Sequence, residues 1–345
     1  MQLFKIFGIA IDLHWTFIAL LALIFLLGGL DTLGIAFILF GSVVLHELSH
    51  SLVARGYGIG VKKIVLLPIG GMSMMDEFAM PANAELWVSA AGPAFSLFLA
   101  ILAFAVELVS PFPALTALAA TAKDANVLLC AFNLLPALPL DGGRVWRALR
   151  QRSRSYLAAT KEAVTLSRFT VFVILLFSFL LALFFDGLAF LFWNGIIALF
   201  IYVGADMELD AAIFKAASEG ITVRDAMRRD MVTASGEETL QNALELAYNG
   251  KVRNLLLVTK KGFGVVPVAS FAKVPRANWG KVKIKSLSAV PIKCSPKDDV
   301  LEVWKNMRLS RIELAPVIEG GKLTGIVSET DIERLIYLRR LALIT

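Results

Sequence analysis

The sequence predicts a polytopic α-helical membrane protein, with six transmembrane helices and a short membrane-associated β segment, joined to a soluble α/β domain. Three observations predict this fold class. Hydrophobic residues make up 57% of the 345 residues, and the mean hydropathy of +0.72 is too high for an ordinary soluble protein. The long uncharged stretches lie almost entirely before residue 207. The remainder has a mixed composition and repeats itself once, which is typical of stacked units that bury a shared face.

Six stretches of the first half are candidate membrane spans, because a transmembrane helix needs about 20 predominantly apolar residues. They are residues 15–30, 33–54, 85–109, 125–140, 169–185 and 188–203. An even number of spans places both termini on the same side of the membrane. We therefore expect the soluble domain to share the side of the N-terminus.

The basic residues predict which side that is. The loops at one end of the spans carry Lys5, Arg55, Lys62, Lys63, Arg144, Arg147, Arg150, Arg152, Arg154, Lys161 and Arg168, whereas the loops at the opposite end carry Lys123. By the positive-inside rule, both termini and the soluble domain are cytoplasmic, in a multi-pass protein of the cell membrane. The net charge of +6 is concentrated near the membrane segments, so we expect contacts with the lipid bilayer and no nucleic acid partner.

The second span contains the motif His46-Glu47-x-x-His50. Residues four apart lie on the same face of a helix, so the two histidines can hold one metal ion. Zinc with three protein ligands keeps a position for water, and Glu47 could take the proton of that water. An ionisable residue within a membrane span costs about 2.5 to 3.5 kcal/mol and usually marks function. The motif predicts metal-assisted hydrolysis, and the alternative is a chance match or a structural pair.

Residues 61–75 are too few to span the membrane as a helix. A β-branched run there ends in Pro68 and Gly70-Gly71, which predicts a strand and a hairpin at the membrane surface. A free strand edge beside a protease site could pair with an extended substrate, so Gly70 and Gly71 are candidate substrate-binding residues. The alternative is an ordinary interfacial loop packed by its methionines.

The fourth span ends in a second candidate motif, which runs from Asn133 through two prolines to Asp141-Gly142-Gly143-Arg144. The two histidines lack a third protein ligand. Asp141 is framed by prolines and glycines that break the helix and let the backbone wrap around a metal ion, and two histidines, one aspartate and water complete a tetrahedral site. The alternative is that Asp141 caps a helix.

These two motifs, with Ala-Gly-Pro at residues 91–93 in the third span, resemble the site-2 protease family of intramembrane zinc metalloproteases. Residues 8–15 are also similar to the start of that family's archaeal and bacterial branch, whose members have a cytoplasmic regulatory domain. The resemblance implies regulated intramembrane proteolysis of a membrane-anchored protein substrate. It also implies that spans one, five and six gate the entry of that substrate.

The resemblance further implies a role for each motif residue. Glu47 would be the general base, and one zinc ion per chain would be held by His46, His50 and Asp141. Asn133 would position the substrate or stabilise the tetrahedral oxyanion. The alternative function is a metal-binding membrane transporter or scaffold without hydrolysis. Glu47 favours the protease, because transport needs ligands whereas proteolysis also needs a base beside them.

The predicted domain boundaries follow the change in composition. Residues 1–207 form the membrane domain, and residues 208–220 read as a linker helix closed by a glycine. Residues 221–345 contain the repeat, with copies at about 221–280 and 284–345. Each copy has an amphipathic helix followed by hydrophobic strands.

The repeat resembles a tandem pair of CBS (cystathionine-β-synthase-type) domains. Residues 325–331 of the second copy, which include Ser328 and Asp331, are similar to that family's nucleotide motif. The resemblance implies one site for ATP, ADP or AMP, with Ser328 toward phosphate and Asp331 toward the ribose hydroxyls, and gating of the protease by the nucleotide. The first copy lacks the aspartate. A structural role in a homodimer is an equal alternative, because Ser and Asp at this spacing also cap a following helix.

Overall fold

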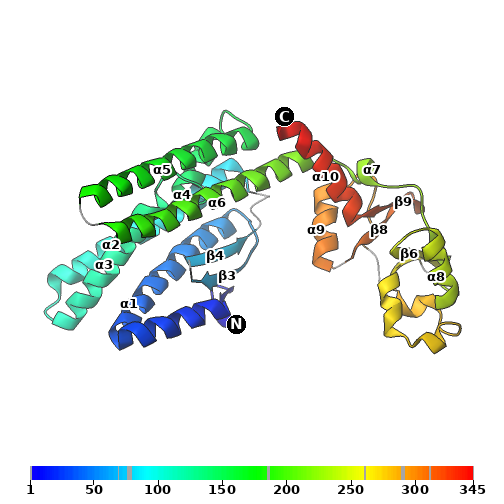
Figure 1. The fold of residues 1–345 in the computed structure, drawn as a ribbon, viewed down its shortest axis with the longest axis horizontal. Coiled ribbons are helices and arrows are strands. Elements are labelled where there is room, and N and C mark those ends of the chain that lie inside the picture. Colours follow the sequence, from blue (N-terminus) through cyan, green and yellow to red (C-terminus); the bar gives the residue numbers. More distant parts are fainter. Residues whose placement is uncertain are drawn as a thin grey trace. The chain divides into compact units, whose positions relative to one another are not determined.

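The computed structural model describes residues 2–68, 70–75, 80–184, 187–259, 262–288, 292–310 and 312–344 (Figure 1). The chain forms two compact units, Met1–Ala212 and Ile213–Thr345, and we describe each by itself. The helices that begin in the first unit are α1 (Trp15–Gly56), α2 (Ala82–Val109), α3 (Pro113–Asn133), α4 (Asp141–Arg150), α5 (Tyr156–Phe184) and α6 (Leu188–Ser218). Among the described residues, five of these helices, all except α4, are long and apolar enough to cross a membrane.

The first two predicted spans are the two arms of α1. Gly29 interrupts this helix with φ 70° and ψ −161°, a backbone conformation that glycine adopts without steric cost. The arms before and after Gly29 run in different directions (Figure 1). The six predicted spans therefore correspond to five helices, of which the first is bent.

The fourth predicted span has the wrong boundaries. It was placed at residues 125–140, whereas α3 begins at Pro113 and ends at Asn133. The predicted span begins too late because Lys123 and Asp124 interrupt the apolar run in the middle of α3; the structure pairs Lys123 with Glu107 of α2 at 2.9 Å from Nζ to Oε2. At the other end the prolines of the motif cannot continue a helix, so residues 134–140 form a connection and α4 starts at Asp141.

The predicted hairpin is part of a larger sheet. Strands β1 (Gln2–Ile6), β2 (Ile9–Leu13), β3 (Val61–Leu67) and β4 (Gly70–Met75) form a four-stranded sheet in the order β1-β2-β3-β4. The β2–β3 pair is parallel and the other two pairs are antiparallel, so the N-terminal strands extend the hairpin on one side. The other side of β4 is a sheet edge, which packs near α1.

The connection between α3 and α4 lies in the protein core. Ala137 and Leu140 are buried against Ile201 of α6. Leu138 is fully buried in a second cluster that includes Ala205 of α6. These contacts fix the seven residues that lead directly to Asp141.

The second unit is an α/β repeat. Its first copy contains α7 (Val223–Ala226), β5 (Thr233–Ser235), α8 (Leu240–Asn249), β6 (Asn254–Thr259) and β7 (Gly262–Pro267), followed by 3₁₀ helices at Val268–Lys273, Arg276–Asn278 and Ile284–Leu287. The second contains α9 (Val300–Ser310), β8 (Leu314–Glu319), β9 (Lys322–Ser328) and α10 (Glu329–Ile344). Among the described residues, the strands form one sheet in the order β5-β6-β7 and another that pairs β8 with β9.

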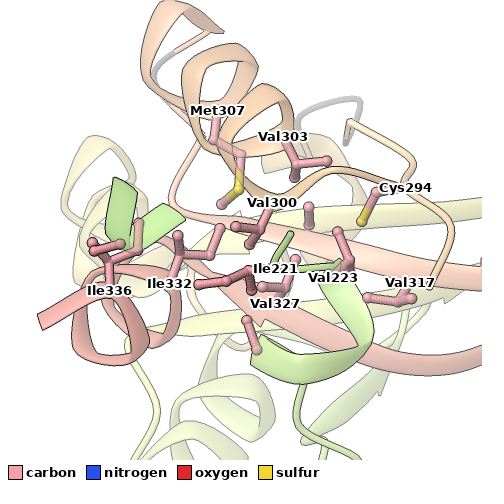
Figure 2. Close-up of a cluster of buried hydrophobic side chains, with 13 residues drawn as sticks. Ile221, Val223, Cys294, Val300, Val303, Met307, Val317, Val327, Ile332 and Ile336 are labelled. Carbon is pink, nitrogen blue, oxygen red and sulfur yellow. The ribbon is translucent and has the colours of Figure 1, made fainter. Parts of the chain in front are cut away.

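The hydrophobic core of the second copy also contains residues from the start of the first copy. Ile221 and Val223, at the start of the repeat, pack in the core of the second copy with Val300, Val327 and other residues (Figure 2). The residues predicted to form a separate linker helix, 208–220, lie mostly in the continuous helix α6. The first residues of the first copy are therefore packed in the core of the second copy.

Candidate metal centre

Three metal-binding side chains converge inside the first unit. Within the described part of the chain, His46, His50 and Asp141 are the one such group of histidine, cysteine and acidic residues; all three are buried, and their ligand atoms lie within 4.8 Å of one another. Asp141 Oδ2 lies 3.1 Å from His46 Nε2 and 3.3 Å from His50 Nε2. Two imidazole nitrogens and a carboxylate oxygen are the donor types that catalytic zinc sites use.

Both histidines are oriented by α2 through the nitrogen that faces away from Asp141. His50 Nδ1 lies 2.6 Å from the carbonyl oxygen of Val88, which can only accept, so Nδ1 carries a proton and Nε2 is the nitrogen that would bind a metal ion in the neutral ring. His46 Nδ1 lies 2.9 Å from Ser96 Oγ. Hydrogen bonds of this kind fix the ring orientation of a metal ligand. Val88 and Ser96 were not predicted from the sequence, because a backbone carbonyl and a lone serine have no recognisable motif.

Gly92 of α2 leaves the space that a metal ion would need. A Cβ atom at this position would lie 2.3 Å from His50 Nε2 and 2.6 Å from His46 Nε2. Any side chain would therefore fill the space beside the two ligating nitrogens. The space beside Gly92 and the types of ligand atom, two imidazole nitrogens and one carboxylate oxygen, both fit a zinc ion.

Asp141 is the first residue of α4 rather than its cap. Leu140 occupies the N-cap position and makes no side-chain capping hydrogen bond. The next residues must be glycines, because a Cβ atom at Gly142 would lie 2.4 Å from two backbone carbonyl oxygens of the preceding connection, and one at Gly143 would lie 2.3 Å from the Leu138 nitrogen. This close packing aims the carboxylate of Asp141 at the histidines.

Glu47 follows His46 on α1 and packs against the start of β4. A Cβ atom at Gly71 would lie 2.5 Å from Glu47 Cγ, so the absence of a side chain there lets the strand approach the glutamate. Ser51 Oγ and Ser73 Oγ, 2.9 Å apart, tie the same strand to α1. The structure thus places Gly71, the second residue of the edge strand, beside Glu47, and among the described residues nothing lies within 4 Å of a Cβ atom built at Gly70.

Asn133 is the last residue of α3 and precedes the connection to Asp141. Its Nδ2 donates a hydrogen bond of 2.9 Å to the carbonyl oxygen of Leu129, one turn earlier in the same helix. The hydrogen bond that the structure records for Asn133 is therefore local and does not reach the metal-binding cluster.

In the second unit, Ser328 and Asp331 form a capping box at the start of α10. The backbone N–H of Asp331 donates to Ser328 Oγ at 3.2 Å, and the backbone N–H of Ser328 donates to Asp331 Oδ2 at 3.2 Å. Asp331 Oδ2 also accepts from Arg228 Nε at 2.9 Å. The structure therefore has the helix cap that the sequence offered as the alternative to a nucleotide site.

A cavity of about 530 Å³ lies between the two copies beside this cap. It is lined by residues of both copies, among them Arg228, Lys251, Arg253, Glu313 and Ser328. Three basic side chains (Arg228, Lys251 and Arg253) line it together with four acidic ones (Asp230, Glu313, Glu329 and Glu333), so the charge of the lining as a whole does not favour an anionic ligand.

Comparisons with known proteins cover both halves of the chain. Residues 34–126 and 110–177 match the model of peptidase family M50, and residues 223–270 and 284–338 match that of the CBS domain. The zinc metalloprotease MJ0392 of Methanocaldococcus jannaschii is 32% identical over 350 residues, which cover 99% of this chain and 97% of that protein.

Two further similarities each cover part of the chain. Stage IV sporulation protein FB of Bacillus subtilis is 34% identical over 104 residues, which cover 30% of this chain and 35% of that protein. The solved structure of a site-2 protease from Methanocaldococcus jannaschii matches 61% of this chain and 94% of its own at 37% identity, with a TM-score of 0.45.

The match to MJ0392 extends over nearly the whole of both proteins, and two family models match the corresponding halves. Five apolar helices also agree with a multi-pass membrane protein. The chain belongs to peptidase family M50, the site-2 protease family of intramembrane zinc metalloproteases, and carries a pair of CBS domains.

Proposed function

We propose that His46, His50 and Asp141 bind the catalytic zinc ion and that Glu47 is the general base of peptide hydrolysis. The observation that carries this proposal is the convergence of three buried ligand atoms beside Gly92, where the backbone leaves room for an ion. When bound, zinc lowers the pKa of a coordinated water to about 7 and polarises a carbonyl group. Glu47, next to His46 on α1, is placed to accept the proton.

The other residues of the centre would orient its parts. The Val88 carbonyl and Ser96 hold the two imidazole rings, and burial keeps bulk water away from the ligands. Asn133, at the end of α3, is proposed to position the substrate or stabilise the oxyanion. Its local hydrogen bond would have to be exchanged for one to the substrate.

We infer that the substrate is a membrane-anchored protein that reaches the site in an extended conformation. The free edge of β4 begins at Gly70, and its second residue, Gly71, lies beside Glu47. An extended peptide that pairs with this edge would present its backbone to the zinc-binding residues. A helical substrate would have to unwind locally before it could be cut.

The protease role is tested with Glu47→Gln in the full-length protein. The substitution keeps the shape of the side chain and all three ligands, so bound zinc should stay at one equivalent per chain while cleavage of a membrane-anchored substrate falls at least about a hundredfold. Zinc content by mass spectrometry and cleavage by gel assay measure the two effects. Full cleavage by Glu47→Gln would contradict the role of Glu47, whereas wild-type protein that holds zinc and cleaves no membrane-anchored substrate would favour a metal-binding transporter or scaffold.

The second candidate function is nucleotide regulation through the CBS pair. We propose that residues 221–345 form a cytoplasmic regulatory domain and that ATP, ADP or AMP occupies the cavity beside Ser328. The cavity residues Arg228, Lys251 and Arg253 would pair with the phosphate groups. A nucleotide could gate the protease only if it binds one state of the protein more tightly than the other.

Calorimetric titration of the full-length protein with each nucleotide tests this proposal, with Asp331→Ala as the key variant. Asp331 does not itself line the cavity, but it hydrogen-bonds Ser328 and Arg228, which do. Asp225→Ala is its matched control, because Asp225 closes the same kind of capping box with Thr222, which does not line the cavity. We expect affinity to fall in Asp331→Ala and to persist in Asp225→Ala. If no nucleotide releases or absorbs heat, the domain is better explained as a dimerisation module.

A further inference from the structure

A buried cluster of ion pairs joins α4 to α2 and α6. Arg147 of α4 lies between Glu85 of α2, at 2.5 Å from Nη2 to Oε1, and Glu208 of α6, at 2.7 Å from Nη1 to Oε2. Arg144 Nη2 pairs with the other oxygen of Glu208 at 2.7 Å. The side chains of Arg147, Glu85 and Glu208 are 3%, 7% and 14% exposed. Two arginines and two glutamates balance, so the cluster carries no net charge.

Buried ions need good geometry, because the cost of removing them from water is recovered only through close pairing and hydrogen bonds. Burial opposes the charge on Arg147, but Glu85 and Glu208 outweigh this effect and raise the pKa of the guanidinium group. Both arginines lie on α4, one and two turns after Asp141, on roughly the same side of the helix. The cluster therefore fixes the position of the short helix whose first residue is a proposed zinc ligand.

The side of α6 that carries Glu208 also holds the connection before Asp141. One face of α6 is formed by residues that follow the helical pattern i, i+3, i+4, i+7. They are Ile201, Gly204, Ala205 and Glu208, and we call these four residues the α6 clamp. Ile201 and Ala205 pack in the two clusters that bury the connection. A Cβ atom at Gly204 would lie 2.6 Å from Cδ and Cγ of Pro139, so helix and proline ring are already in contact.

We propose that the α6 clamp positions the carboxylate of Asp141, with Gly204 and Glu208 as its positioning residues. The inference rests on the zinc site proposed above. His46 and His50 are held by α1 and α2, whereas Asp141 reaches them from a segment that α6 covers. A shift of α6 would thus move one of three ligands and leave the other two in place.

The first test is Gly204→Ala, with Gly195→Ala as its matched control. Both glycines lie in α6 and gain the same methyl group and a similar increase in helix propensity, but a Cβ atom at Gly195 meets nothing within 4 Å. The rigid ring of Pro139 cannot move aside as a flexible side chain would. Full-length protein in detergent is loaded with Zn²⁺ and challenged with a chelator. We expect Gly204→Ala to release zinc at least about tenfold faster than wild type, and Gly195→Ala to match wild type.

The second test is Glu208→Gln, with Asp206→Asn as its matched control. Asp206, also on α6, pairs with Arg168 at 2.9 Å, but this ion pair is about half exposed and does not involve α4. Both substitutions keep the shape of the side chain and remove one charge. Protein loaded with Co²⁺ reports the ligand geometry through its visible absorption spectrum. We expect a changed spectrum and faster zinc release in Glu208→Gln, and wild-type behaviour in Asp206→Asn.

The outcomes separate the two proposals. Wild-type protein that holds no zinc overturns the zinc site, and with it this inference. Wild-type protein that holds zinc, with Gly204→Ala and Glu208→Gln indistinguishable from their controls in zinc release and Co²⁺ spectrum, overturns the α6 clamp alone. A lower melting temperature with unchanged metal properties also overturns it, because the residues would then serve stability only.

Discussion

At the scale of single residues, each histidine turns one ring nitrogen toward Asp141, and a hydrogen bond on the other ring nitrogen holds this orientation. The Val88 carbonyl can only accept, so it fixes the tautomer of His50 by itself. Ser96 can both donate and accept, and it orients His46 without that restriction. A partner on α2 therefore sets both the orientation and the tautomer of His50, but only the orientation of His46.

Ser96→Ala should weaken zinc binding by about 10- to 100-fold, because it removes the partner that holds the His46 ring. The measurement is competition with a chromogenic zinc chelator. Ser89→Ala is the control: Ser89 is buried on the same helix, so the substitution removes a similar hydroxyl group without touching a ligand. Equal zinc affinity in the two variants would show that the His46 ring is held by its packing alone.

At the scale of elements, the parts that follow a repeating pattern could be predicted from the sequence. The spacing of His46 and His50 places them on one face of a helix, and both lie on α1. The glycines and β-branched residues before Met75 indicated the β3–β4 hairpin. The start of α3 could not be predicted in this way, because Lys123 interrupts the apolar run and its partner Glu107 belongs to another helix.

The rest of the centre depends on contacts between distant parts of the chain. Gly92 matters because its missing side chain faces two histidines more than forty residues away along the sequence, on α1. Gly204 matters because it meets Pro139. Small residues of this kind are common in membrane helices, so their presence in a sequence does not indicate what they contact. Strands β1 and β2 were not predicted, because β1 pairs with β2 and the partner that joins β2 to the sheet, β3, lies beyond α1 along the chain.

At the scale of the whole molecule, α6 is the helix that joins the two units of the chain. It carries the α6 clamp in the first unit and continues without interruption to Ser218, whereas the second unit begins at Ile213. Phe214 and Ala217 of the same helix pack in the core of the second CBS copy. If the CBS pair regulates the protease as proposed, a displacement of this end of α6 would reach the residues before Asp141 through the helix and the α6 clamp.

Regulation by a cytoplasmic nucleotide requires that the CBS pair lie in the cytoplasm, and the topology can be tested at three positions. We expect Ser153→Cys, in the exposed connection between α4 and α5, to be protected from a membrane-impermeant maleimide in intact cells, because that connection is rich in arginine. Ala114→Cys, at the exposed start of α3, should react without permeabilisation. A fluorescent reporter fused after the last residue should lie in the cytoplasm.

Cys130 and Cys294 are both buried, so the wild-type chain provides a low background for this labelling. Burial, followed by the nearby charge of Asp298, raises the pKa of the Cys294 thiol to about 12, so at neutral pH it stays protonated and unreactive. Permeabilised cells are the control, because Ser153→Cys should react in them. Labelling of Ser153→Cys in intact cells, together with a C-terminal reporter outside, would reverse the orientation and remove cytoplasmic nucleotides as ligands of the CBS pair. An α4–α5 connection inside and a reporter outside would instead mean that α5 and α6 cross the membrane an odd number of times in total.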